Sequence, residues 1–131
     1  MTDQRLGRVV DASALLALLH AEPGAASVEE VVEHAAISTV NWSEVCQRSL
    51  VRGVDVAGLR SDVGALGLEI VAFTVDDAEQ AARFSPQTRR LGLSLGDRAC
   101  LALARRLEMP ALTADRSWLD LNLDVQIEAI R

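Results

Sequence analysis

The stretch SLGDRACLALARRLEMPALTADRSW, residues 94–118, carries a helical pattern that leads directly into a strand pattern. Apolar residues recur on one helix face over residues 95–107, and the run PALTA predicts a strand over 110–114. Asp97 stands at the start of the predicted helix, and Asp115 stands just after the predicted strand. Helices that alternate with short strands build α/β domains with a mostly parallel sheet. The stretch therefore predicts an α/β fold, and it raises the question of why two acids flank it.

The same alternation extends over the rest of the chain. Its 131 residues predict a single domain over residues 1–131. Strands are predicted at residues 8–10, 36–40, 68–73, 110–114 and 125–130, the last at a sheet edge. Helices are predicted at residues 12–21, 28–36, 41–53, 56–66, 74–83 and 95–107, with Ser27 as the cap of the second.

Composition restricts the chemistry. Half of the residues are hydrophobic, the formal net charge is −6, and every basic side chain is an arginine. The absence of lysine excludes mechanisms that need a lysine nucleophile or a lysine phosphate clamp. Non-specific nucleic-acid binding needs excess positive charge, so binding here would require a local arginine cluster or a metal ion.

Cysteine usage and hydropathy bear on the location of the chain. Cys46 and Cys100 lie in apolar helical patterns without a C-x-x-C motif, so we expect buried free thiols and a reducing cytoplasm. The first apolar run is interrupted by Asp11, and it shows neither a signal peptide nor a membrane span.

Four acids fall at junctions between strands and helices: Asp11, Glu44, Asp97 and Asp115. The carboxyl ends of parallel strands share one sheet edge, where ligands bind in open α/β sheets. Each acid also has a local interpretation as a helix cap, since Asn41-x-x-Glu44 and Ser94-x-x-Asp97 fit capping boxes. Thr74-x-x-Asp77 has the same spacing. Spacing alone therefore does not separate a site from a cap.

Carboxylates gathered at one edge would repel one another unless they take up protons or bind a cation. An all-oxygen set suits Mg²⁺ or Mn²⁺ rather than zinc, and we expect His20 and His34 to be surface residues. A metal ion held in this way lowers the pKa of a bound water and stabilises charge on a phosphate. The joint interpretation of the acids is a site for phosphodiester hydrolysis.

Four segments together resemble a known family. They are VVDASALLALL at 9–19, STVNWSEV at 38–45, LSLGDRACLALA at 93–104 and ALTADRSW at 111–118. In this order they resemble the PIN-domain ribonucleases, and most of all the VapC-type toxins of bacterial toxin–antitoxin pairs. The resemblance implies a three-layer sandwich with a five-stranded, mostly parallel sheet between helices. It also implies a metal-dependent endoribonuclease that cleaves structured RNA such as transfer or ribosomal RNA.

The resemblance assigns roles to individual residues. Asp11, Glu44, Asp97 and Asp115 become the catalytic, Mg²⁺- or Mn²⁺-binding acids, with Asp11 and Asp97 as the direct ligands. Glu44 and Asp115 would hold a second metal or orient the attacking water. Ser13 would support Asp11 or hydrogen-bond a phosphate, and Thr113 would tune the pocket. The residues assigned to RNA contact are Arg89, Arg90, Arg98 and Arg116.

Several of these residues keep a structural interpretation. Asn41 is expected to cap a helix, and Trp42 and Trp118 are expected to pack in the core or an interface. Arg98 and Arg116 fit solvated salt bridges at least as well as RNA contacts.

Partners follow from the resemblance as well. It implies a VapB-like antitoxin whose C-terminal segment enters the acidic pocket with an arginine, and a homodimer. Residues 28–36 or 56–66 could supply the dimer face. A phosphoacceptor receiver and a dehalogenase-type phosphatase do not fit, since both need a lysine and a different acid pattern. A catalytically inactive PIN-like module that binds RNA or protein remains the alternative.

Overall fold

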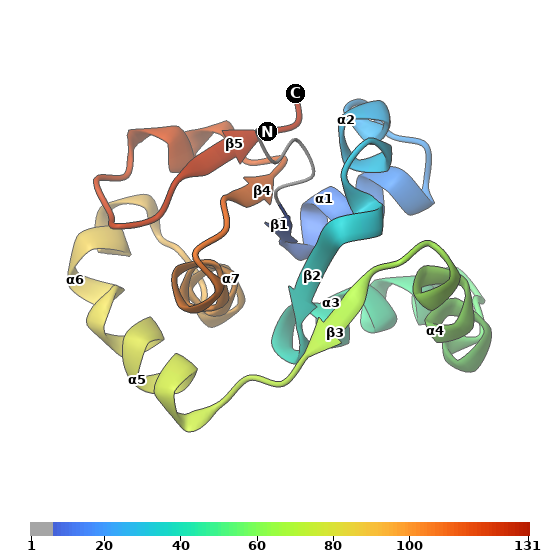
Figure 1. The fold of residues 1–131 in the computed structure, drawn as a ribbon, viewed down its shortest axis with the longest axis horizontal. Helices are drawn as coiled ribbons and strands as arrows, with labels where there is room; N and C mark the ends of the chain where they lie inside the picture. The colour runs from blue at the N-terminus through green and yellow to red at the C-terminus, as the bar shows by residue number, and fades with distance from the viewer. Residues whose placement is uncertain (1–6) are drawn as a thin grey trace, which may run out of the picture.

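The computed structural model describes residues 7–131, so the first six residues of the predicted 1–131 domain lie outside the described part. The predicted α/β class is confirmed, with five strands in one sheet of order β3-β2-β1-β4-β5 (Figure 1). Every pair of neighbours is parallel, and β5 lies at an edge as predicted. The strands are β1 (Arg8–Val10), β2 (Ala35–Ser38), β3 (Glu69–Val71), β4 (Ala111–Thr113) and β5 (Ile127–Ala129).

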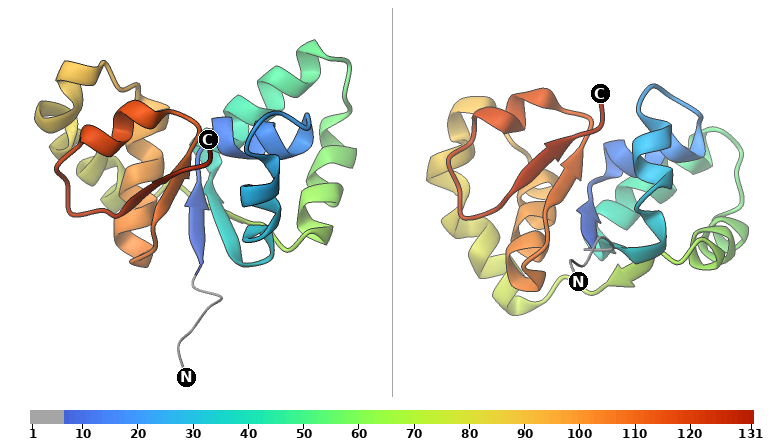
Figure 2. Two further views of the ribbon diagram at one scale, coloured as in Figure 1. Left: turned by 90° about the horizontal axis from the view of Figure 1, so that it is seen from above. Right: turned by 45° about the horizontal axis from the view of Figure 1, so that its top comes forward.

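Two groups of helices cover the two faces of the sheet (Figure 2). On one face lie α1 (Ala12–Leu19), α2 (Ala25–Glu29), α3 (Thr39–Val51) and α4 (Val56–Ala65). On the other lie α5 (Val75–Arg83), α6 (Ser85–Thr88) and α7 (Leu95–Leu107). Residues 7–131 also form three short 3-10 helices: η1 (Val32–His34), η2 (Arg89–Leu91) and η3 (Arg116–Asp120). The arrangement is the predicted three-layer sandwich.

The core has two parts, one on each side of the sheet. Consecutive residues of the central strand β1 point to opposite faces, with Val10 in the core under α1 and Val9 in the core under α7. Leu15 and Ile37 are fully buried in the first part, and Trp118 is fully buried in the second. The prediction that Trp118 packs in the core is thus confirmed. Trp42 is partly buried and packs against the first part of the core.

The helix predicted over residues 28–36 is wrong. Only its first two residues belong to α2, which begins at Ala25, ends at Glu29 and has Gly24 rather than Ser27 at its N-cap. Residues 32–34 form the 3-10 helix η1. Ala35 and Ala36 belong to β2, where they pair with β1 and β3. Alanine has little intrinsic strand preference, so parallel pairing on both sides overrides the helical spacing. The predicted strand over 36–40 ends at Ser38, and the two residues after it begin α3.

None of the helices within residues 7–131 combines the length and apolar character needed to cross a membrane. Both cysteines are free; Cys100 is buried and Cys46 is half-buried.

Candidate active site

Three of the four predicted acids, Asp11, Glu44 and Asp97, line one small pocket of about 150 Å³. Asp11 directly follows β1, and Glu44 lies in the second turn of α3, which begins where β2 ends. Asp97 lies in the first turn of α7. The pocket therefore lies at the carboxyl edge of the sheet, as the parallel topology predicts.

Asp11 is both a helix cap and the buried centre of this pocket. Its side chain is 4% exposed and caps α1, with Oδ1 accepting hydrogen bonds from the Ala14 N–H (2.8 Å) and the Ser13 hydroxyl (2.7 Å). Its Oδ2 accepts a hydrogen bond from the Thr113 hydroxyl at 2.5 Å. Ser13 and Thr113, the two residues predicted to support Asp11 and to tune the pocket, thus both contact Asp11 directly.

The pKa of Asp11 is raised from its ordinary value of 3.8 to about 6, mainly by burial and to a smaller extent by the nearby negative charge of Asp97. The hydrogen bonds from Thr113, Ala14 and Ser13 favour the ionised form but do not offset the loss of hydration. No ion pair within residues 7–131 neutralises the charge of an ionised Asp11, although the exposed Arg48 also lines the pocket.

Asp97 closes a capping box at the start of α7. Its Oδ2 accepts a hydrogen bond from the Ser94 N–H (2.9 Å), and the Ser94 hydroxyl accepts one from the Asp97 N–H (3.2 Å). Within residues 7–131, Oδ1 of Asp97 makes no side-chain hydrogen bond or ion pair. One oxygen caps the helix, and the other is available to the pocket.

Asp77 shows what a purely structural acid looks like in this chain. The Thr74–Asp77 box at the start of α5 is formed as predicted. The Asp77 side chain is 2% exposed, and both its oxygens accept hydrogen bonds from Arg106, at 2.8 and 3.0 Å. The guanidinium group of Arg106 neutralises the charge of Asp77, whereas the charged group near Asp97 is the carboxylate of Asp11.

Glu44 is held by Asn41, whose amide nitrogen donates to Glu44 Oε1 and to the Gly96 carbonyl, both at 2.9 Å. The prediction that Asn41 caps a helix is wrong. Ser38 caps α3 instead, because the helix begins at Thr39, and Asn41 lies inside its first turn with 1% exposure. Asn41 therefore joins α3 to the start of α7.

Gly96 is a site residue that the sequence analysis did not identify. A Cβ atom at this position would lie 2.6 Å from Glu44 Oε1 and 2.8 Å from Oε2. Its only signal in the sequence is a glycine in the first turn of a strong helix, one residue before a candidate acid.

Asp115 does not line the acidic pocket. It is exposed and caps η3, as its local interpretation predicts, with Oδ1 accepting from the Ser117 N–H (3.0 Å) and hydroxyl (2.7 Å). Its backbone N–H donates to the Thr113 hydroxyl oxygen at 3.0 Å, so one residue separates it from Asp11. The four predicted acids thus divide into three in the pocket and one beside it.

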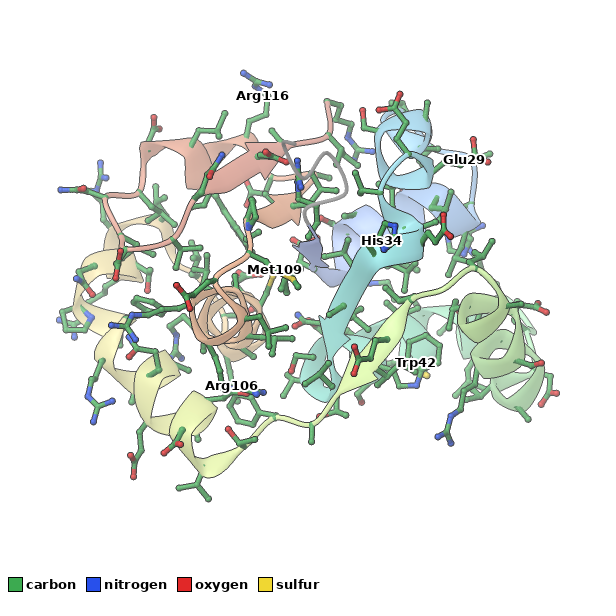
Figure 3. All side chains as sticks on the ribbon, viewed as in Figure 1. Glu29, His34, Trp42, Arg106, Met109 and Arg116 are labelled. Atoms are coloured by element: carbon green, nitrogen blue, oxygen red, sulfur yellow. The ribbon has the colours of Figure 1, made fainter. Side chains whose placement is uncertain are left out.

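The arginines predicted to contact RNA lie outside the pocket lining. Arg98 donates to the Ala81 carbonyl (3.0 Å), and Arg116 donates to the backbone oxygen of Arg131 (3.0 Å) and extends outward at the edge of the molecule (Figure 3). Neither forms the expected salt bridge within the described chain, because each finds a backbone acceptor instead. Arg89 and Arg90 are exposed in η2.

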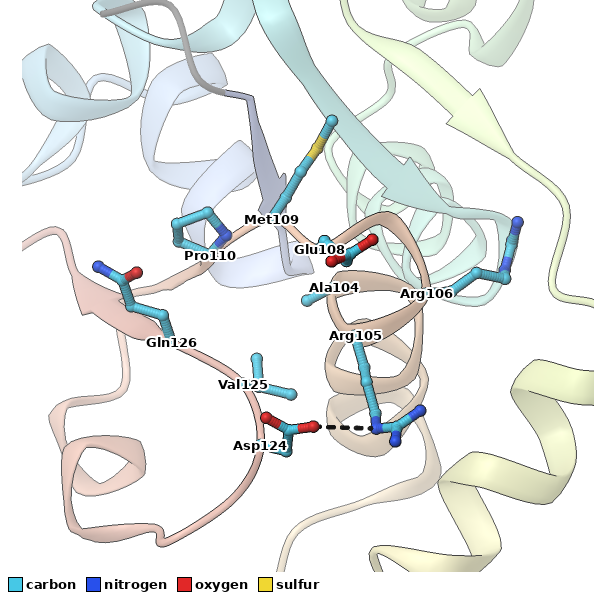
Figure 4. Close-up of a pocket in the computed structure, with 9 residues that line it drawn as sticks. All are labelled: Ala104, Arg105, Arg106, Glu108, Met109, Pro110, Asp124, Val125 and Gln126. Atoms are coloured by element: carbon cyan, nitrogen blue, oxygen red, sulfur yellow. Dashed lines mark ion pairs between the residues drawn. The ribbon is translucent and has the colours of Figure 1, made fainter. Parts of the chain in front are cut away.

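A larger cavity, of about 540 Å³, lies at the other end of α7 (Figure 4). It contains the exposed ion pair between Arg105 and Asp124, whose atoms are 3.7 Å apart. None of the four predicted site acids lines it. Its size alone does not make it the functional site.

The pocket donors fit a hard divalent cation. Its three acids are carboxylates, and neither histidine lines it; His34 is exposed and His20 half-buried. No three His, Cys, Asp or Glu side chains within residues 7–131 are close enough to surround an ion by themselves. Mg²⁺ typically binds through one or two carboxylates and keeps several waters, so it does not require three protein ligands. The buried Asn41 Oδ1 has no hydrogen-bond partner within those residues.

The sequence and the fold are similar to those of known proteins. The family model of the PIN domain matches residues 8–122. A toxin–antitoxin complex from Klebsiella pneumoniae has a similar fold, with TM-score 0.78 and 18% identity over 95% of this chain and 98% of that chain. VapBC2 from Rickettsia felis, bound to a DNA fragment from its promoter, has TM-score 0.68 and 14% identity over 95% and 98%.

FitAcB from Neisseria gonorrhoeae has TM-score 0.67 and 17% identity over 94% of this chain and 97% of that chain. No curated protein matches the sequence. At these identities the solved structures support the fold, and the family model covers most of the chain. The chain belongs to the PIN domain family.

Proposed function

We propose that this protein is a divalent-metal-dependent endoribonuclease that acts as the VapC-type toxin of a toxin–antitoxin pair. The observation that carries the proposal is the pocket in which Asp11, Glu44 and Asp97 meet at the carboxyl edge of a PIN-domain sheet. One of these carboxylates, Asp11, is buried with a raised pKa and forms no ion pair within residues 7–131. Such a pocket favours a bound metal ion and, through it, a phosphate group.

Asp11 and Asp97 are proposed to hold Mg²⁺ or Mn²⁺ directly, and Glu44 to orient a water through the contact that Asn41 maintains. The ion, when bound, supplies Lewis-acid stabilisation of the phosphate charge and lowers the pKa of a coordinated water. Hydrogen bonds from Thr113 and Ser13 fix the orientation of the Asp11 carboxylate. Asp115, beside the pocket, is proposed to act through intervening waters.

The proposed substrate is a phosphodiester bond in RNA, with transfer or ribosomal RNA as the class that the resemblance suggests. Arg89, Arg90 and Arg116 are exposed and are proposed to contact backbone phosphates. Arg98 would have to leave the Ala81 carbonyl to do so.

A VapB-like antitoxin is the proposed partner. The solved structures with the same fold include VapBC complexes, and a pocket of three carboxylates attracts a guanidinium. A homodimer and a cytoplasmic location are proposed with it. Val28, Val32 and Ala35 are buried in the core, so these apolar side chains of residues 28–36 are not available to a partner. In the other segment, 56–66, Leu66 is 42% exposed.

The proposed function predicts that Asp97→Asn weakens Mn²⁺ binding about tenfold or more. The melting temperature should change little, because an amide oxygen can still accept the hydrogen bond from Ser94. Calorimetric titration with Mn²⁺, thermal melting and cleavage of RNA with and without EDTA measure these effects.

Asp77→Asn is the matched control, since it changes the same residue of the same type of capping box. It should lower the melting temperature, because the buried pair with Arg106 is broken, and leave Mn²⁺ affinity unchanged. Equal Mn²⁺ affinity in wild type and Asp97→Asn would contradict the metal site. Wild-type protein that binds Mn²⁺ but cleaves no RNA would favour the inactive PIN-like module.

A further inference from the structure

We propose that a groove beside the acidic pocket binds the sugar–phosphate backbone of a single RNA strand next to the cleaved bond. The groove has a volume of about 480 Å³ and is lined by residues of α1 and α3, with Arg131 joining them. This inference rests on the proposed function for its substrate. It assigns RNA binding to Arg48 and Arg52, which the sequence analysis did not single out.

The groove is continuous with the acidic pocket. Ser13, Leu16 and Arg48 line both cavities. A strand whose scissile phosphate lies at the three carboxylates would therefore reach the groove directly beside them. The larger cavity at the far end of α7 shares no lining residue with the acidic pocket.

The charge of the groove is opposite to that of the chain. Three arginines and His20 line it against one acid, Glu22, although the formal net charge of the protein is −6. Within residues 7–131, the guanidinium groups of Arg48 and Arg52 make no ion pair or side-chain hydrogen bond. Unpaired, exposed arginines next to an acidic pocket are available to phosphates, which they bind through paired N–H donors.

The arginines also have a regular spacing along α3. Glu44, Arg48 and Arg52 follow one another at intervals of four residues, so they lie on one helix face with an advance of about 6 Å per step. The face begins at the acidic pocket and runs along the groove. Successive phosphates of one strand would meet Arg48 and then Arg52.

The walls of the groove favour the backbone over the bases. Leu16 and the 86% exposed Val51 supply aliphatic surface, and the residues that line the groove include no Phe, Tyr or Trp for stacking. Binding should therefore depend little on base sequence and strongly on salt.

The test compares two double variants that lose the same charge. Arg48→Gln/Arg52→Gln removes the groove arginines, and Arg60→Gln/Arg83→Gln removes exposed arginines of α4 and α5 that line neither cavity. Fluorescence anisotropy measures the affinity for a labelled twelve-nucleotide oligouridine, with Ca²⁺ in place of Mg²⁺, over a range of salt concentrations. The groove variant should bind about tenfold or more weakly, with a salt slope reduced by about 1.4, which is the value for two lost phosphate contacts on a single strand. The control should stay within about twofold of wild type.

Equal RNA affinity and salt slope in wild type and the groove variant would overturn the groove assignment, even if wild type cleaves RNA. If RNA binding depends on the two arginines but wild type cleaves no RNA, the groove assignment would be supported and the proposed nuclease activity would be contradicted. If an oligoglutamate peptide binds as tightly as oligouridine at the same salt concentration, the assignment of the groove to RNA would be overturned in favour of an acidic protein partner. Mn²⁺ calorimetry on the groove variant should show an undiminished affinity, because the substitutions remove no carboxylate and take a positive charge away from the pocket lining. A loss of Mn²⁺ affinity would show that the substitutions disturb the metal site, and the groove assignment would then fail.

Discussion

Asp11→Asn is expected to reduce RNA cleavage by about a hundredfold to a thousandfold while making the metal-free protein more stable at pH 7. Activity should fall because the substitution removes the charge of the most buried carboxylate of the pocket. The fold should persist because the amide oxygen can still cap α1 at Ala14, and the amide nitrogen can donate to the Thr113 hydroxyl oxygen. Loss of activity and gain of stability in one variant is the signature of a functional acid.

The expected stability gain follows from the raised pKa of Asp11. The folded-state value of about 6 lies above the ordinary value of 3.8, so the fold favours the protonated form. The contribution of Asp11 to stability is fully present below pH 4, falls as the pH rises through 6, and is lost at pH 7. The difference in pKa corresponds to about 3 kcal/mol, which Asn, a neutral mimic of the protonated acid, should largely retain at pH 7.

Urea unfolding in EDTA between pH 4.5 and 8 measures this effect. The free energy of unfolding of Asp11→Asn minus that of wild type should grow with pH up to about 7 and then stay constant. Adding Mg²⁺ at pH 7 should stabilise wild type and not the variant. An equal pH dependence in both proteins would show that Asp11 is not desolvated in the folded state.

The acids illustrate how far the sequence leads. Capping-box spacing predicted correctly that both Asp77 and Asp97 begin helices. It did not show that Asp77 is neutralised by Arg106, 29 residues away, or that Asp97 lies near Asp11. Those facts depend on how α5 and α7 pack, which local spacing does not encode.

Local spacing also did not identify the roles proposed for Asn41, Arg48 and Arg52. Asn41 has the local appearance of a cap, and its contact with the Gly96 carbonyl spans 55 residues of chain. Arg48 and Arg52 line a groove only once α1 and α3 lie side by side on the sheet. The strands and most of the helices were predictable because their signals are periodic and local, whereas Ala35 and Ala36 became strand through pairing on both sides.

Gly96→Ala tests whether close packing of α7 against Glu44 builds the site. The new Cβ would lie 2.6 Å from Glu44 Oε1, so the carboxylate must move and its hydrogen bond with Asn41 must break. We expect RNA cleavage and Mn²⁺ affinity to fall about 10- to 100-fold, as they do when groups that orient metal ligands are displaced. The fold should be kept, because the moving atoms are the far end of a flexible side chain that is half-buried.

Gly58→Ala is the matched control, because Gly58 lies in the first turn of α4, beside the carboxylate of Asp55. Its Cβ would lie 3.5 Å from Asp55 Oδ2, an ordinary van der Waals distance. This variant should keep full activity and gain about 0.5–1 kcal/mol, since alanine loses less backbone entropy than glycine in a helix. Combining Gly96→Ala with Glu44→Asp, which withdraws the carboxylate by one methylene, should recover part of the lost Mn²⁺ affinity. Full activity of Gly96→Ala, or no recovery in the double variant, would show that Glu44 does not need the space that Gly96 leaves.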